Sequence, residues 1–139
     1  MPRSKPELPI TLGLFAFRDK SVMLMTQGLG PQPFHGRIVI LINEWTNSAA
    51  EMLANFAAEN GLAEVVGQKT RGNVLGAANF QLGGGYWLRI PVFGWFTSKG
   101  QSLEGNGVGP DIEIENRPET LAANKDEQLN KALETSRAR

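Results

Sequence analysis

The sequence predicts an α/β domain, because a buried strand, an amphipathic helix and a second apolar strand follow one another and precede an antiparallel hairpin. Residues 38–42 are a continuous apolar run rich in β-branched side chains, typical of a strand covered on both faces. Residues 47–60 carry apolar side chains at 49, 52, 53, 56 and 57, the stripe of a helix that packs on a core. Gly61 stands where a left-handed residue ends such a helix, and 63–66 form the second strand. This βαβ unit is expected to be parallel and right-handed.

The second half of the chain changes to an antiparallel pattern. Residues 74–82 and 86–96 flank three successive glycines and predict a hairpin. Pro91 lacks a backbone N–H, which indicates an edge or a bulge in the second arm. The alternation over 112–115 predicts a half-exposed strand, and leucines among charges over 119–137 predict a terminal helix.

The first 35 residues give weaker signals. Residues 1–20 are expected to form an irregular arm, 21–26 a short strand, and 28–36 a Gly/Pro-rich connection. The predicted organisation has three parts: an arm and connection (1–35), a core (36–118) and a C-terminal helix (119–139).

Composition excludes several classes of function. The 139 residues are 41% apolar and 20% charged, as in an ordinary globular domain. The 14 basic and 14 acidic side chains cancel without a basic stripe, so no nucleic-acid partner is expected. With no cysteine and one histidine, neither a thiolate nor a histidine-rich metal site is expected, and no cofactor is predicted. No apolar run is long enough to span a membrane, and the compartment stays open.

Ser48 stands at the junction of the predicted strand and helix. Sites in open α/β sheets gather at the carboxyl ends of strands. A helix start offers unpaired N–H groups to a developing oxyanion, worth roughly 3–4 kcal/mol per donor in hydrolases. However, Ser48 and Glu51 also have the spacing of a capping box, and there is no G-x-S-x-G elbow. The pattern alone therefore favours a helix cap.

Four sequence blocks favour the interpretation of Ser48 as a catalytic residue. They follow one another at consistent spacing: Asn43-Glu44 with Ser48-Ala49-Ala50-Glu51, then 66–72, 97–102 and 105–111. These blocks resemble the catalytic core of C-terminal processing (tail-specific) serine proteases and of the related tricorn protease. The resemblance implies a ClpP/crotonase-like core, a peptide or protein substrate, Ser48 as the nucleophile, and the Ala49 N–H as an oxyanion donor.

The resemblance also bears on the general base. One branch of the family uses a lysine, but Asn73 stands at that position and an amide cannot accept the proton. Lys69 matches a variable position and is interpreted as a solvated lysine. The tricorn-like branch uses a histidine oriented by a glutamate, and Glu104 matches that glutamate; its alternative interpretation is a surface residue in a Gly-rich loop.

The single histidine does not fit the role of base. His35 precedes the strand that ends near Asn43, and the seven intervening residues span more than ~20 Å at ~3.3 Å each. His35 and Ser48 are thus expected at opposite ends of one strand. We interpret the chain as a piece of a longer peptidase, incomplete on its N-terminal side and close to inactive alone. Its missing upstream half would supply the base, and its open sheet edges predict self-association.

A second interpretation is a non-catalytic peptide- or lipid-binding module on the same scaffold. Five aromatic residues could line an apolar pocket or simply pack in the core and hairpin: Trp45, Trp87, Phe93, Trp95 and Phe96. An acyl-CoA enzyme of the crotonase type would share the fold, but no CoA-binding cluster is visible. For the peptidase, residues 72–80 are a candidate edge for binding substrate as an added strand.

Overall fold

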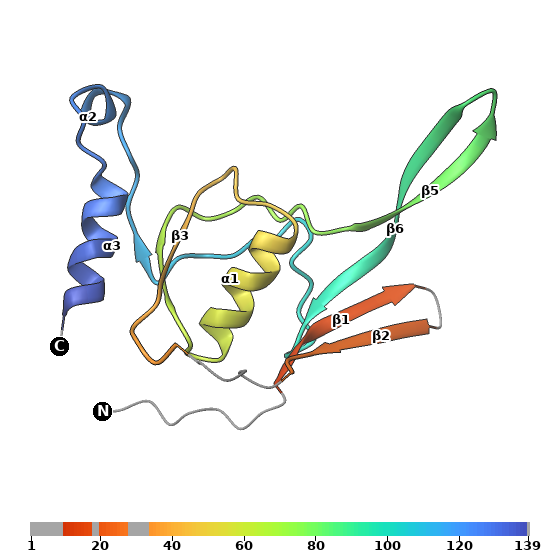
Figure 1. Cartoon of the computed structure of the whole chain (residues 1–139), viewed down its shortest axis with the longest axis horizontal. Helices are drawn as coiled ribbons and strands as arrows, with labels where there is room; N and C mark the ends of the chain where they lie inside the picture. Colours follow the sequence, from red (N-terminus) through yellow and green to blue (C-terminus); the bar gives the residue numbers. More distant parts are fainter. Residues whose placement is uncertain (1–9, 18–19, 28–33, 139) are drawn as a thin grey trace.

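Two sheets meet around helix α1 in the computed structural model, which describes residues 10–17, 20–27 and 34–138 (Figure 1). One sheet has the strand order β2-β1-β6-β5, and the other has the order β3-β4-β7. The strands are β1 (Thr11–Phe17), β2 (Lys20–Met25), β3 (Val39–Ile42), β4 (Glu64–Gly67), β5 (Gly76–Gly83), β6 (Tyr86–Thr97) and β7 (Ile112–Glu113). The helices are α1 (Ala49–Glu59), α2 (Pro118–Ala122) and α3 (Glu127–Arg137). Over the described residues, no helix has the length and apolarity needed to cross a bilayer.

The predicted βαβ unit is confirmed. β3 and β4 pair in parallel, with Val39 opposite Glu64 and Ile42 opposite Gly67, and β7 adds in parallel to β4. α1 connects β3 to β4, and Gly61, two residues after its last residue Glu59, has a φ of 62°. A short connection, residues 43–48, joins the end of β3 to the start of α1, so α1 begins at the edge of the sheet where the parallel strands end.

The core draws on loops as well as on regular elements. Its buried cluster consists of Ile42, Ala54, Val65, Val74, Trp95, Leu103 and Val108. Trp95 is 2% exposed and meets Phe15 edge-on at 4.7 Å between ring centroids. Full burial of one such apolar side chain is worth roughly 1.5–3 kcal/mol. Since Val74, Leu103 and Val108 lie outside the strands and helices, the loops that carry them are fixed by the core.

The expected irregular arm is wrong for residues 11–17, which form β1. This strand pairs antiparallel with β2 on one side and with β6 on the other, placing Phe15 opposite Trp95. A Cβ at Gly13 would lie 2.4 Å from the Trp95 ring, so the glycine permits the close approach of the strand. The predicted strand at 21–26 is confirmed as β2. Residues 1–9 and most of the predicted connection, 28–33, lie outside the described residues.

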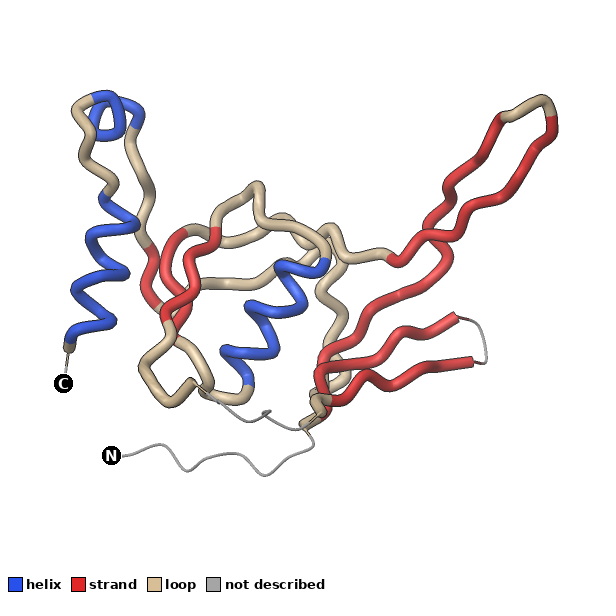
Figure 2. Tube along the Cα trace, viewed as in Figure 1, coloured by secondary structure: helices blue, strands red, loops and turns tan. Residues whose placement is uncertain are grey.

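The hairpin and its bulge are also confirmed. β5 and β6 pair antiparallel, and the register slips between Gly76 opposite Phe93 and Ala77 opposite Pro91. Beyond this bulge the hairpin projects from the rest of the molecule (Figure 2). We call residues 77–91 the β5–β6 arm. Its exposed large side chains are Phe80, Leu82, Tyr86, Trp87, Leu88 and Ile90.

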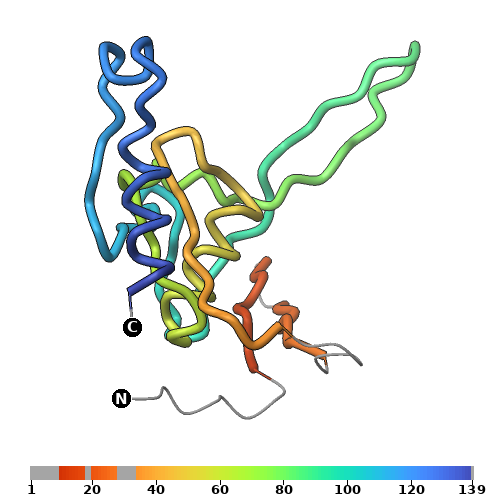
Figure 3. The backbone as a smooth tube through the Cα atoms, turned by 60° about the vertical axis from the view of Figure 1, so that its left-hand side comes forward, coloured from red at the N-terminus to blue at the C-terminus, as the bar shows by residue number. Residues whose placement is uncertain are grey.

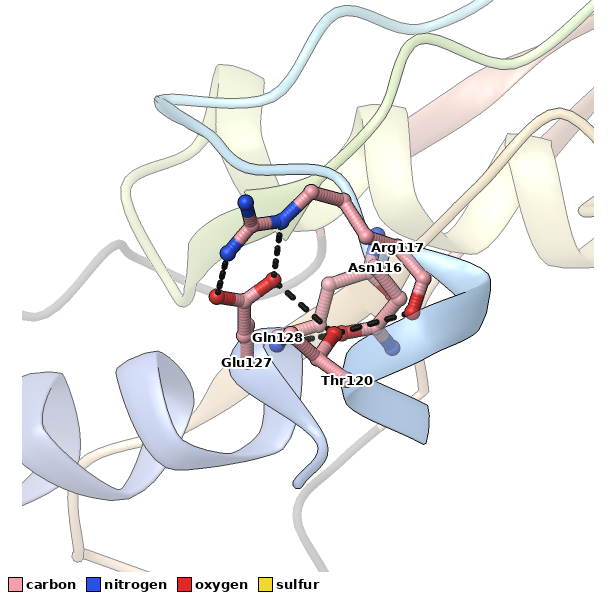
Figure 4. A network of polar contacts seen from close by, with 5 residues as sticks. All are labelled: Asn116, Arg117, Thr120, Glu127 and Gln128. Atoms are coloured by element: carbon pink, nitrogen blue, oxygen red, sulfur yellow. Dashed lines mark hydrogen bonds and ion pairs between the residues drawn. The ribbon is translucent and has the colours of Figure 1, made fainter. Parts of the chain in front are cut away.

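The single terminal helix predicted over 119–137 is two helices, α2 and α3. The chain turns at Asn124, whose φ is 56°, a conformation that asparagine tolerates better than most residues. α3 then begins at Asp126, whose carboxylate accepts the Leu129 N–H at 2.8 Å. A network around Arg117 and Glu127 joins the two helices (Figure 4).

α3 contacts β3 and β4 from the side opposite to α1 (Figures 1 and 3). Arg37, just before β3, donates to the carbonyls of Thr135 (2.8 Å) and Ala138 at the end of α3. These bonds satisfy carbonyls that a helix end leaves unpaired. The expectation that β3 is covered on both faces holds only in part, because Leu41 remains 42% exposed.

Candidate active site

Ser48 has a backbone conformation that an ordinary helix cap does not have. Its φ is 54° and its ψ is −126°, whereas an N-cap residue normally has β-region angles. Among the described residues, the only other non-glycine with positive φ is Asn124. Such a conformation costs on the order of 1–3 kcal/mol and persists only where the surroundings impose it. A strained turn from a strand into a helix is also the device that presents the serine in a nucleophile elbow. Ser48 is exposed at this turn.

The buried carboxylate of Glu51 imposes the turn. Its side chain is fully buried and accepts the N–H groups of Ser48 (3.1 Å), Gly72 (2.8 Å) and Asn73 (2.9 Å), together with the Thr70 hydroxyl. The Asn73 carbonyl in turn accepts the Ser48 N–H at 2.9 Å. The reciprocal capping interaction predicted for Glu51 is thus one part of a larger network, which ties the start of α1 to residues 70–73. Sequence reasoning missed that extension.

Glycines in the motif blocks bring two loops together backbone to backbone. A Cβ on Gly72 would lie 2.4 Å from the Leu103 carbonyl oxygen, and a Cβ on Gly107 would lie 2.1 Å from that of Thr70. Both glycines have left-handed φ values, 82° and 67°. Across the same contact, the Thr70 hydroxyl accepts the Val108 N–H at 2.8 Å. The spacing of these glycines therefore has a physical cause, the packing of residues 70–73 against 103–108.

Glu104 lies beside this framework and does not hydrogen-bond to Ser48. One of its oxygens, Oε2, accepts the N–H groups of Val74 (2.8 Å) and Leu75 (3.1 Å), which directly follow Asn73. Within the described part of the chain, its other oxygen has no hydrogen-bond partner. The carboxylate is thus anchored at one oxygen and available at the other.

Ala49 occupies the first position of α1 and is exposed. Its N–H finds no acceptor among residues 10–17, 20–27 and 34–138. It lies at the positive end of the helix dipole, directly after Ser48. This is the environment that an oxyanion donor needs, and the donor role of Ala49 stays a prediction.

The candidate bases in the chain lie where the sequence suggested. His35 is exposed and precedes β3, whereas Ser48 follows the carboxyl end of that strand. Lys69 is exposed, as interpreted. Asn73, at the position of the family's lysine, is next to Ser48 through its backbone. In the described ranges, no group of three or more His, Cys, Asp or Glu side chains could hold a metal ion.

The five aromatic residues considered for a ligand pocket lie in different surroundings. Trp95 is core, and Phe93 packs against Phe17 with ring centroids 5.5 Å apart. Trp87 is 63% exposed on the β5–β6 arm, and Trp45 is 67% exposed beside Ser48. A hollow of ≈ 610 Å³ lies instead against α1 and is lined mainly by small and polar residues: Asn55, Ala58, Gln101, Ser102, Leu103, Asn106, Gly107, Val108 and Gly109. None of the five aromatic residues lines this hollow, and the binding module stays an alternative interpretation.

Comparison with known proteins agrees with this geometry. A profile of peptidase family S41 matches residues 11–114. Tricorn protease homolog 1 of Streptomyces coelicolor is 32% identical over 100 residues, covering 70% of this chain and 9% of that protein. The carboxyl-terminal-processing protease of Picosynechococcus is 33% identical over 81 residues, covering 58% of this chain and 20% of that protein.

Solved structures show the same fold. The crystal structure of the tricorn protease superposes with a TM-score of 0.69 and 27% identity, covering 87% of this chain and 12% of that one. A putative peptidase from Parabacteroides merdae has a TM-score of 0.78 and 17% identity, covering 96% and 44%. These neighbours have a ClpP/crotonase-like fold. The chain spans about a tenth of the length of the tricorn relatives that it matches.

Proposed function

The chain belongs to peptidase family S41, and from this premise we propose that it forms the nucleophile-bearing part of a serine endopeptidase that hydrolyses peptide bonds through Ser48. The observation that carries the proposal is the backbone of Ser48. Its positive φ at an exposed strand-to-helix turn is held by a buried carboxylate. A residue whose task was to cap the helix would need no such strain.

In this mechanism the Ser48 hydroxyl oxygen attacks the scissile carbonyl carbon while a base removes its proton. The carbonyl electrons move to oxygen, and the Ala49 N–H donates to that oxyanion. The proton passes to the leaving amine, and water then hydrolyses the acyl-enzyme. Glu104 uses its unengaged oxygen to orient the base, since its other oxygen is committed to Val74 and Leu75.

The general base comes from outside this chain. Three observations support this: His35 precedes β3 whereas Ser48 follows it, Lys69 is exposed to solvent, and Asn73 carries an amide. The isolated chain is accordingly close to inactive, because loss of the base in a serine peptidase such as subtilisin costs on the order of 10⁶ in kcat.

The substrate binds as an added strand along residues 72–80. β5 is an outer strand in the order β2-β1-β6-β5, so its free edge offers backbone groups to a peptide. Residues 73–75 lead from the Ser48 contact directly into β5, which brings a bound peptide to the nucleophile.

A fluorophosphonate probe tests the proposal, applied to the chain alone and to the chain supplied with the upstream part of its peptidase core. We expect labelling in the second preparation, lost in Ser48→Ala and retained in Ser136→Ala, which removes another exposed serine. If neither preparation is labelled although both are folded, Ser48 is only a helix cap and the proposed function is wrong.

A further inference from the structure

An exposed arginine is held on an exposed tryptophan beside Ser48. The guanidinium carbon of Arg71 lies 4.3 Å from the centroid of the Trp45 ring. A cation–π contact at such a site is worth about 0.5–1 kcal/mol. The backbone at Trp45 is itself positioned, because the backbone N–H of Trp45 donates to the Asn43 side chain at 2.9 Å and the Thr46 N–H donates to the Asn43 carbonyl at 3.0 Å. Arg71 therefore stacks on a side chain that a closed turn carries.

This stack joins the two segments that build the Ser48 turn. Trp45 lies three residues before Ser48 in the connection from β3 to α1. Arg71 directly precedes Gly72, whose N–H donates to the buried Glu51 carboxylate. The next residue, Asn73, accepts the Ser48 N–H with its carbonyl. The backbone at both ends of the stack is thus fixed relative to the nucleophile.

The guanidinium has no acidic partner in the described part of the chain. The ion pairs found there are Arg117–Glu127 and Lys131–Glu134, and no carboxylate oxygen lies within 4.0 Å of Arg71. Glu44, the residue before Trp45, makes no ion pair with it. A guanidinium stacked on an aromatic face keeps its planar set of N–H donors at the edge, where it matches a carboxylate in a bidentate manner.

We propose that Arg71, oriented by Trp45, is a specificity determinant that binds a carboxylate of the peptide substrate next to Ser48. The proposal rests on the proposed function for the identity of the ligand as a peptide. The carboxylate has two sources, the C-terminal α-carboxylate of the peptide or the side chain of an Asp or Glu near the cleaved bond. Both would pair with the same donors.

Peptide binding to the full chain carrying Ser48→Ala tests this without turnover. The probes are alanine-rich hexapeptides with a neutral fluorophore, read by fluorescence anisotropy. One pair has a free or an amidated C-terminus, and the other has an internal Glu or Gln with an amidated end. We expect the carboxylate-bearing member of at least one pair to bind about five- to tenfold more tightly. The pair that responds identifies the source.

Variants test whether the preference for a carboxylate depends on the stack of Arg71 on Trp45. Arg71→Gln should abolish the discrimination, and Trp45→Leu should reduce it because the guanidinium loses its orientation. Lys69→Gln is the matched control, since it removes another exposed positive charge two residues away, and it should leave the discrimination unchanged. The proposal is wrong if neither pair discriminates, if no peptide binds, or if Lys69→Gln lowers the discrimination as much as Arg71→Gln.

Fluorophosphonate labelling of the parent chain with its upstream region separates this proposal from the proposed function. Arg71-dependent discrimination without labelling of Ser48 would support the carboxylate site and overturn the catalytic role. Labelling of Ser48 without discrimination would do the reverse.

Discussion

The Ser48 turn and the β5–β6 arm are both exposed, and they are supported in opposite ways. Beneath the turn, one buried carboxylate accepts four hydrogen bonds and two loops meet through their glycines. The arm is a two-stranded ribbon whose large apolar side chains face solvent, and Arg89 is its single charged residue. An isolated hairpin is marginally stable in water. The turn is thus supported by this chain, whereas the arm presents a surface of the kind that other protein covers.

The largest effect should come from removing the carboxylate beneath the turn. Glu51→Ala leaves the N–H groups of Gly72 and Asn73 and the Thr70 hydroxyl without their acceptor, so we expect a loss of about 3–5 kcal/mol in the free energy of unfolding. Urea denaturation measures it. Glu59→Ala on the same helix removes a carboxylate that accepts one exposed hydroxyl, from Ser98, and should cost less than about 1 kcal/mol. Equal losses would show that the Glu51 network does not support the turn.

The contact between the two loops should be next in size. Gly72→Ala forces a Cβ to 2.4 Å from the Leu103 carbonyl oxygen at a left-handed φ, and should cost about 2–4 kcal/mol. Gly105→Ala is the control, because its φ is 71° but nothing lies within 4 Å of the added Cβ. It should cost only the conformational part, about 1–2 kcal/mol. Thermal unfolding of the two variants side by side would refute the close contact if they lost equal stability.

Substitutions in the β5–β6 arm should change the self-association of the chain and leave its free energy of unfolding nearly unchanged. Leu82→Gln combined with Trp87→Gln replaces two side chains that are 64% and 63% exposed, so the free energy of unfolding should change by less than about 0.5 kcal/mol. We expect the parent chain to self-associate and the double variant to shift toward monomer in sedimentation velocity. A parent chain that is monomeric at all concentrations would count against the arm as an interaction surface.

The smallest effect should come from the Glu127 carboxylate, which lies at the surface, whereas the Glu51 carboxylate is buried. Arg117 donates to Glu127 (Figure 4), and this hydrogen bond is the main cause that lowers the pKa of Glu127. A lowered carboxyl pKa stabilises the fold above the ordinary carboxyl range, and that contribution is lost as the pH falls through the folded-state value. In Arg117→Gln, NMR titration should show the Glu127 pKa moving up.

Asp126 serves as the internal control of this titration. Its pKa is lowered chiefly by the Leu129 N–H, so it should stay low in Arg117→Gln. An unchanged Glu127 pKa would show that Arg117 does not hold that carboxylate in solution.

How far the sequence predicts the molecule depends on the range of the interactions involved. The βαβ unit, the hairpin and the bulge at Pro91 followed from apolar periodicity and turn chemistry, which are local. β1 could not be recognised, because its place depends on Gly13 meeting Trp95 far along the chain. The break at Asn124 was hidden by the leucines that continue on both sides of it.

The same distinction applies to the candidate site. Its place at the head of α1 was predictable from the strand and helix patterns. The positive φ of Ser48 was not, because it is imposed by Glu51 together with Gly72 and Asn73, more than twenty residues later. Local patterns thus indicated an ordinary helix cap. Only the long-range network around Glu51 shows that Ser48 instead occupies a strained turn.

The packing of Gly72 against the 103–108 loop also has a consequence for how this site varies. Main-chain contacts and the buried Glu51 carboxylate set the shape of the site, and the side chains at 71 and 73 are exposed. An exchange of either side chain leaves those main-chain contacts in place. In the peptidase proposed above, the substrate preference would therefore be open to redesign at position 71 while Ser48 stays in place.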